Sequence, residues 1–109
     1  MEKEIYELHA SICQTLSNPK RLEILNLLRE KEVPVSQLIK ITGLPKANLS
    51  QHLAILRQKK IVLARREGVN IYYRIANPKV IKACDLMREV LYEQLSKEQK
   101  LTRILKSKK

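Results

Sequence analysis

The chain has 109 residues, about the length of one ordinary domain. Lys and Arg total 22 against 11 Asp and Glu, so the formal net charge is +11, and 44% of the residues are hydrophobic. This composition is too apolar for a disordered polycation and too basic for an ordinary small enzyme, so we expect an anionic partner. Aromatic residues make up 4% of the chain and all are Tyr, which argues against a base-stacking platform for single-stranded nucleic acid.

The sequence predicts one cytoplasmic domain over residues 1–109, with reduced thiols and no membrane association. No long apolar stretch opens or interrupts the chain, and its two cysteines, Cys13 and Cys84, form no Cys-x-x-Cys unit. The few His, Cys and Asp residues include no nucleophile with a base and an orienting group at suitable spacing. We therefore expect no enzymatic activity and no catalytic residues.

Two helices are predicted at the start of the chain. Apolar residues recur at helical spacing at Ile5, Leu8, Ile12 and Leu16. Asn18 followed by Pro19 is typical of the cap and first turn of a second helix, which we expect to stop near Lys31.

A helix-turn-helix is predicted next. Val33-Pro34-Val35 favours a short extended segment, because proline lacks a backbone donor and biases the residue before it away from helix. Ser36 is expected to cap a short third helix that runs through Thr42 and ends at Gly43. Leu44-Pro45 then begins a fourth helix that runs to about Lys60. Two short helices joined by a tight glycine turn are typical of this motif.

A β-hairpin and a long helix complete the predicted fold. Ile61–Glu67 and Ile71–Ile75 resemble strands joined by Gly68-Val69-Asn70, and a hairpin directly after a helix-turn-helix is a wing. Asn77-Pro78 begins a fifth helix to about Leu95, and Ser96 with Gln99 predicts a capping box for a shorter last helix. The fold class is therefore mainly α with a small β-hairpin wing, in the order helix, helix, strand, helix, helix, strand, strand, helix.

The basic charge is concentrated where this motif lies. No acidic residue occurs from Val33 to Arg66, while the cations Lys40, Lys46, Arg57, Lys59, Lys60, Arg65 and Arg66 all do. A solvated surface is the alternative interpretation, but a polyanion held against this face better explains a run that excludes acids.

The fourth helix carries the predicted base-reading face. If Leu49, Leu53 and Leu56 point inward, Ala47, Asn48 and Gln51 point outward. Asn and Gln can bond adenine through two atoms, and a small Ala allows close approach to a thymine methyl. An ordinary exposed helix start is the alternative. The full set of predicted DNA contacts adds phosphate-binding flanks and a basic wing: Lys46, Ala47, Asn48, Ser50, Gln51, His52, Arg57, Arg65, Arg66, Asn70 at the tip, and Arg74.

Several stretches in this order resemble the ArsR/SmtB family of winged-helix repressors. They are residues 16–25 (LSNPKRLEIL), 49–57 (LSQHLAILR), 65–68 (RREG) and 71–75 (IYYRI). The resemblance covers roughly residues 5–95. It implies a homodimer that represses an operon by binding double-stranded promoter DNA and releases it when a metal ion, an arsenic species or an oxidant binds. It also implies that Ser50, Gln51 and His52 lie on the DNA-contacting helix.

The sensing residues of that family do not carry over. Where metal-sensing members have two cysteines around the start of the third helix, this chain has Pro34 and Ser36. At the other common site, on the fifth helix, the corresponding residues are Asn77, Lys79, Val90 and Glu93, and only the last of these can bind a metal. The resemblance therefore predicts DNA binding, but the family's usual metal-binding inducer sites are not present in this sequence.

The first and fifth predicted helices carry the candidate sensor residues and the candidate dimer surface. His9, Cys13 and Cys84 can converge as a soft-metal site, or the thiols can join under oxidation; the alternative is two buried core thiols with a nearby His. Residues 1–17 and 77–105 are the predicted dimerisation helices, because the fifth helix has more apolar surface than one small core can cover. Apart from such a soft metal ion, we expect no cofactor. The alternative function is a constitutive DNA-binding or chromosome-associated winged-helix protein without an inducer.

Overall fold

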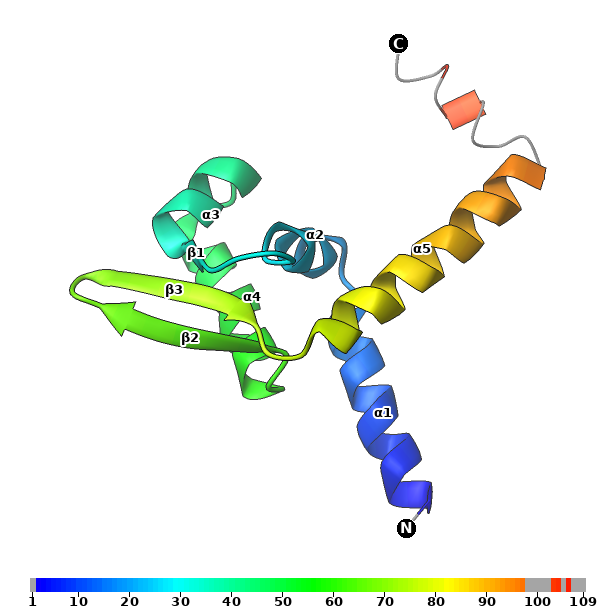
Figure 1. Ribbon diagram of the computed structural model, residues 1–109, viewed down its shortest axis with the longest axis horizontal. Helices are drawn as coiled ribbons and strands as arrows, with labels where there is room; N and C mark the ends of the chain where they lie inside the picture. The colour runs from blue at the N-terminus through cyan, green and yellow to red at the C-terminus, as the bar shows by residue number, and fades with distance from the viewer. Residues whose placement is uncertain (1, 98–102, 105, 107–109) are drawn as a thin grey trace. The chain divides into compact units, whose positions relative to one another are not determined.

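The computed structural model describes residues 2–97, 103, 104 and 106. It divides into two compact units, residues 1–78 and 79–109. The first unit contains α1 (Glu2–Leu16), α2 (Pro19–Leu27), β1 (Val33–Pro34), α3 (Val35–Thr42), α4 (Lys46–Gln58), β2 (Val62–Glu67) and β3 (Asn70–Ile75), labelled in Figure 1. α5 (Pro78–Lys97) begins at the last residue of the first unit and continues in the second. The order of elements is the predicted one.

Two predicted helix ends are confirmed in detail. Asn18 caps α2, its Oδ1 accepting hydrogen bonds from the backbone N–H groups of Lys20 (3.0 Å) and Arg21 (3.2 Å), and Pro19 occupies the first helical position. α3 ends at Gly43, which takes a left-handed φ of 69°. A residue with a Cβ is strained at such an angle, so glycine defines the tight turn before α4.

Two other predicted boundaries were wrong. α2 ends at Leu27 rather than near Lys31. The buried Leu28 closes the helix with bonds to two preceding carbonyls, and the chain then turns so that Val33 can pair with Tyr73 in the sheet. Ser36 does not cap α3, because the extended Pro34 occupies the cap position and Ser36 already lies inside the helix.

α4 also ends before the predicted Lys60, at Gln58. The N–H of Ile61 bonds the carbonyl of Leu56, and the N–H of Lys60 bonds that of Arg57. This pair of bonds is a Schellman motif, which normally places glycine at the left-handed position. Here that position holds Lys60, with φ of 60°.

The sheet has three antiparallel strands in the order β1-β3-β2. Glu67 pairs with Asn70, so the hairpin loop has only two residues, Gly68 and Val69. Gly68 has φ of 63°, which suits the first loop position of a type II′ turn. Asn70 was predicted at the tip but lies in β3, and Val69, 96% exposed, takes its place.

The core lies between α2, α3, α4 and the base of the hairpin. Its fully buried side chains are Ile24, Leu25, Leu28, Leu38, Leu49, Leu53, Leu56 and Val62. Burying one such aliphatic side chain contributes about 1.5–3 kcal/mol. Three of them belong to α4, so hydrophobic packing determines which side of this helix faces outward.

α5 matches the predicted fifth helix and extends two residues beyond the expected end. Ser96 lies inside α5, so it does not cap a new helix there, and its predicted partner Gln99 lies outside the described residues. Among the described helices, none has both the length and the apolar character needed to cross a membrane.

Candidate nucleic-acid interface

The outward face of α4 carries the residues that the sequence predicts to contact DNA. Leu49, Leu53 and Leu56 are at most 1% exposed, which confirms the predicted helix phase. The opposite side presents Lys46, Ala47, Asn48, Ser50 and Gln51, all exposed, and Arg57 is exposed further along. A rigid helix with a buried leucine row and an exposed amide face has the form that enters a major groove.

His52 differs from these neighbours because it is half-buried and already has a partner. The Nε–H of Arg21 on α2 donates a hydrogen bond to its Nδ1 over 3.2 Å. Partial burial and the nearby charge of Arg21 both lower the pKa of His52. With Nδ1 as the acceptor, the neutral ring carries its proton on Nε2.

The three arginines predicted for the wing lie on two faces of the hairpin. Alternation along the strands puts Arg65, Tyr72 and Arg74 on the side away from the core. Arg66 is on the opposite side, shared with the buried Tyr73, and is exposed because it lies near the tip. Arg66 forms no ion pair within the described part of the chain.

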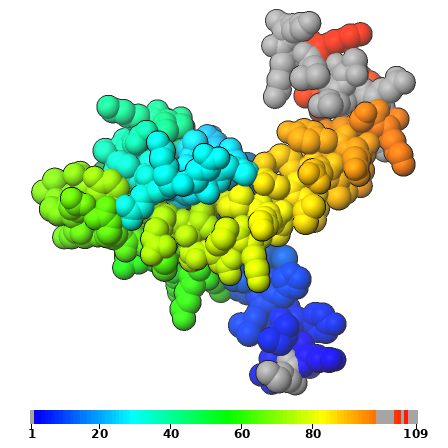
Figure 2. All heavy atoms as spheres, viewed as in Figure 1, coloured from blue at the N-terminus to red at the C-terminus, as the bar shows by residue number. Residues whose placement is uncertain are grey.

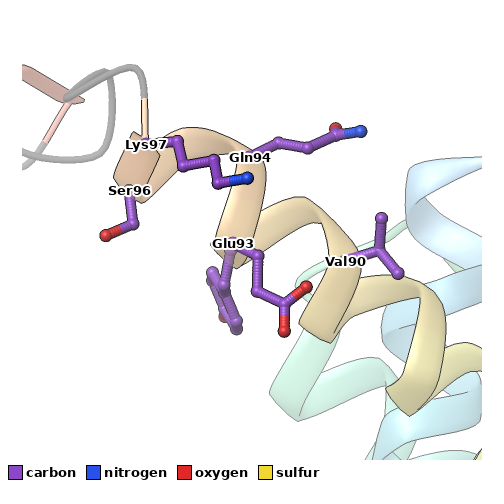
Figure 3. A pocket seen from close by; sticks show the side chains of 6 residues that line it. Val90, Glu93, Gln94, Ser96 and Lys97 are labelled. Atoms are coloured by element: carbon purple, nitrogen blue, oxygen red, sulfur yellow. The ribbon is translucent and has the colours of Figure 1, made fainter.

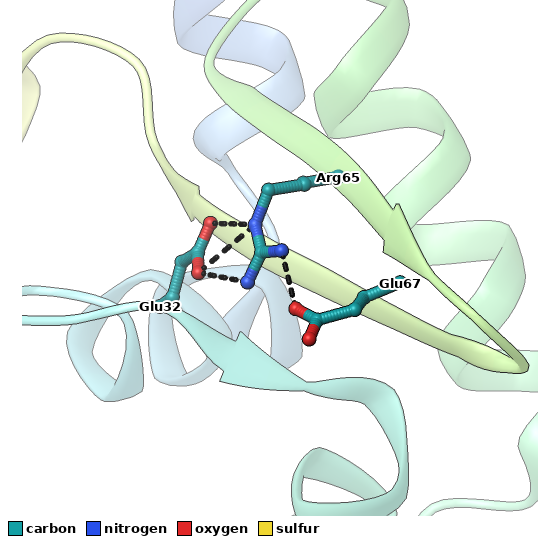
Figure 4. A network of polar contacts seen from close by, with 3 residues as sticks. All are labelled: Glu32, Arg65 and Glu67. Carbon is teal, nitrogen blue, oxygen red and sulfur yellow. Dashed lines mark hydrogen bonds and ion pairs between the residues drawn. The ribbon is translucent and has the colours of Figure 1, made fainter.

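Arg65 is held by two carboxylates and a ring, as Figure 4 shows for the carboxylates. Nη2 donates to Oε1 of Glu32 over 2.8 Å, and Nε donates to Oε2 of the same carboxylate over 3.0 Å. Nη1 donates to Oε2 of Glu67 over 2.6 Å. The guanidinium carbon lies 4.7 Å from the centre of the Tyr72 ring. These bonds raise the pKa of Arg65, and its hydrogen bonds lower the pKa of Glu32, with the charge of Arg74 contributing less.

Sequence reasoning missed Arg21, Glu32 and Tyr72. One signal was available for Glu32: it is the last acid before the run without acids, and Glu67 is the first acid after it. Glu32 and Glu67, the two acids that flank this run, both form ion pairs with Arg65.

A groove of about 250 Å³ separates the wing tip from the two helices of the motif. Its polar lining comes from Ser36 on α3, Lys46 and Ser50 on α4, and Asn70 on β3. In Figure 2 the yellow-green wing tip lies next to the teal atoms of α3. Asn70 and Lys46, which lie far apart in the sequence, thus share one surface.

Each unit also exposes large apolar side chains. On α1 these are Ile5 (53% exposed), Tyr6 and Leu8, and on α5 they are Leu86, Met87 (69% exposed), Val90, Leu91 and Tyr92. Figure 3 shows the C-terminal part of α5, where an open hollow of about 650 Å³ lies beside Val90 and Glu93. Contiguous exposed apolar residues of this kind mark interaction surfaces.

The predicted sensor residues are on two helices. His9 and Cys13 are exposed on α1, and Cys84 is half-buried on α5. Neither cysteine is in a disulfide. No cluster of three or more His, Cys, Asp or Glu side chains able to hold a metal occurs among the residues that the structure describes. The sensor therefore stays a prediction.

A helix-turn-helix with an outward polar helix, followed by a basic hairpin, defines a winged helix-turn-helix DNA-binding protein. The model of the family described as bacterial regulatory protein, arsR family, matches residues 18–62. Proteins similar to this chain over most of its length are likewise named as transcriptional regulators. The chain belongs to the ArsR family of bacterial regulatory proteins and is a DNA-binding transcriptional regulator.

Two relatives resemble the chain in sequence. One is the uncharacterised HTH-type transcriptional regulator Rv0081 of Mycobacterium tuberculosis, 41% identical over 98 residues that cover 88% of this chain and 86% of that protein. The other is the transcriptional repressor PagR of Bacillus anthracis, 43% identical over 72 residues that cover 65% of this chain and 72% of PagR.

Two solved structures share the fold. The crystal structure of Rv0081 aligns with a TM-score of 0.79 at 39% identity, covering 86% of this chain and 95% of that one. The solution structure of a homodimeric winged helix-turn-helix DNA-binding domain from Mycobacterium bovis aligns with a TM-score of 0.78 at 34% identity. It covers 86% of this chain and 87% of that fragment.

Proposed function

We propose that this chain is a homodimeric transcriptional repressor that binds a dyad operator in double-stranded DNA. The observation that carries the proposal is the division of α4 into a buried leucine row and an exposed polar face, within a segment without acids. Repression is supported by the relatives named as repressors, and a homodimer by the relative described as homodimeric.

In this proposal α4 lies in the major groove. Asn48 and Gln51 read base edges, Ala47 allows close approach, and Lys46, Ser50 and Arg57 bind phosphates. The wing contributes Arg66, Asn70 and Arg74 near the adjacent backbone or minor groove. His52 takes part through its Nε2–H, because Arg21 already occupies Nδ1.

The dimer is proposed to form through α1 and α5, whose exposed apolar residues a second copy would cover. Such a repressor acts in the cytoplasm without enzymatic activity. A signal is proposed to act through Cys13 and Cys84, as an oxidant or a soft metal ion, since the places of the usual ligands hold Pro34, Ser36, Lys79 and Val90.

Selection of bound sites from randomised duplex DNA tests the proposal. We expect two inverted half-sites whose centres are about 10–10.5 base pairs apart, or a multiple of that spacing. A footprint over a promoter containing such a site should show protection of both halves. Binding that selects no sequence would instead favour the constitutive, chromosome-associated alternative.

A further inference from the structure

Arg65 differs from every other cation in the segment without acids. Lys40, Lys46, Arg57, Lys60 and Arg66 form no ion pair within the described residues, and Lys59 donates a hydrogen bond to a serine hydroxyl. Arg65 uses Nε, Nη1 and Nη2 on two carboxylates and lies over an aromatic ring. A single exposed ion pair stabilises little, but a bidentate pair extended into a network is the exception.

Glu32 and Arg65 join two parts of the first unit. Glu32 lies in the turn between α2 and β1, next to the buried Val33, which is a fixed part of the sheet. Arg65 lies midway along β2, at the point beyond which both strands lose most of their burial. The bond therefore ties the outer hairpin to the body of the fold where core packing ends.

The wing depends on such a tie because its outer half has little hydrophobic packing. Residues 65–70 are all exposed. An isolated two-stranded hairpin is only marginally stable in water, so the outer wing needs another constraint to keep one orientation. Preorganisation of this kind lowers the ordering cost of binding.

We propose that Glu32 and Arg65 form a brace that holds the wing in its DNA-binding orientation, which makes Arg65 a positioning residue and leaves the phosphate contact to Arg66. The inference rests on the proposed DNA-binding function and refines the role that the sequence predicts for Arg65. It also assigns a role to an acidic residue in a protein whose partner is a polyanion.

The direction in which one substitution changes DNA affinity distinguishes the brace from a simple effect of charge. Glu32→Gln removes a negative charge from a DNA-binding protein, so charge alone predicts tighter binding. The brace predicts weaker binding, by about three- to tenfold, because the wing loses its orientation. Glu30→Gln is the matched control, since Glu30 is an exposed acid in the same turn without a bond to Arg65. It should leave affinity unchanged or raise it slightly.

Salt dependence and a double-mutant cycle complete the test, using fluorescence polarisation with a duplex from the selected sites. Arg66→Gln should lower the slope of log affinity against log salt by about one, as expected for a phosphate contact. Arg65→Gln should weaken binding without that change in slope. In the Arg65→Gln background, Glu32→Gln should have no further weakening effect, because the brace is already broken.

Binding by Glu32→Gln as tight as wild type overturns the brace, as does a slope for Arg65→Gln that falls like that of Arg66→Gln. Failure of the wild type to bind any duplex refutes the proposed function instead. The brace is then decided by amide hydrogen exchange of residues 66–71 in the protein alone. Exchange that is faster in Glu32→Gln than in Glu30→Gln supports the brace, and equal exchange overturns it.

Discussion

The Nε–H of Arg21 donates a hydrogen bond to Nδ1 of His52 over 3.2 Å and so joins α2 to α4. The same guanidinium donates from Nη1 to the carbonyl of Thr15, and Nζ of Lys59 lies 2.6 Å from Oγ of Ser11. The two bonds to α1 connect it with the middle of the proposed recognition helix, through Arg21, and directly with Lys59, the residue that follows the last turn of α4. A movement of α1 would therefore be transmitted to the base-reading face.

Stability should fall with acidity because of His52. Its pKa is lowered by burial and by Arg21 in the folded state, so the unfolded chain binds more protons once the pH falls below the ordinary histidine value of about 6.5. The contribution of neutral His52 to the free energy of unfolding is complete above the ordinary histidine pKa. It is lost as the pH falls through the lower pKa that His52 has in the folded state. We expect His52→Gln, which keeps an acceptor for Arg21, to reduce this dependence in urea unfolding at pH 7.5 and 5.5.

The matched control for that measurement is His9→Gln, which removes the other histidine from an exposed position on α1. The His9 variant should retain the wild-type dependence on pH. If the free energy of unfolding changes equally with pH in the wild type and in His52→Gln, the contact between Arg21 and His52 has no role in the loss of stability at low pH.

Base reading should depend on Asn48 and Gln51. Replacing either with Ala should cost about 1–3 kcal/mol at one base pair and relax preference there, because one bidentate contact is lost. Arg66→Ala should instead weaken binding to all DNA alike and lower the salt slope by about one. Competition binding with every single-base variant of the site measures both. Identical losses on specific and random DNA for all three variants would contradict the assignment.

The chain should sediment at twice its 12.7 kDa mass at micromolar concentration. Met87→Glu on α5 or Leu8→Glu on α1 should raise the dimer dissociation constant by at least about tenfold, because a charge would be buried in the apolar contact. Val69→Glu is the control, since Val69 is an exposed apolar residue of the wing. A wild-type monomer that still binds DNA tightly would refute the dimer.

Any thiol switch should require Cys13 and Cys84. We expect diamide, zinc, cadmium or arsenite to lower the DNA affinity of the wild type and to leave the Cys13→Ser/Cys84→Ser variant unaffected. The proposed reason is that joining the thiols would pull on α1 and α5 and displace the recognition helices. If none of these agents alters binding by either protein, the constitutive binder becomes the better description.

Substitutions at the two helix ends with left-handed backbone, Lys60 and Gly43, should change the stability of the fold in opposite directions. Lys60→Gly should stabilise the fold by about 0.5–1 kcal/mol, because a lysine adopts φ of 60° there against its preference. Gly43→Ala should destabilise by about 1 kcal/mol through backbone strain alone, since nothing lies within 4 Å of the added Cβ. Urea unfolding of both variants measures the changes. A destabilised Lys60→Gly would mean that its side chain contributes more than the strain removes.

Periodicity and caps predicted nearly all of the fold, because Asn18, Gly43 and the leucine row of α4 act through local rules that a sequence displays. The missed boundaries have a different cause. Leu28 ends α2 early and Pro34 replaces Ser36 as the cap because β1 must reach Tyr73, a pairing between distant residues. In the site, the exposed face of α4 was predictable, whereas the bonds of Arg21 with His52 and of Arg65 with Glu32 join residues more than 30 positions apart.

The run without acids from Val33 to Arg66 is bounded by Glu32 and Glu67, and both carboxylates bind the same arginine. Within the described residues, Lys40, Lys46, Arg57, Lys60 and Arg66 form no ion pair with a carboxylate. Binding a phosphate at any of them breaks no internal ion pair, so the measured salt slope would follow the DNA counterions released at each contact. The slope divided by about 0.9 would then give the number of phosphates neutralised.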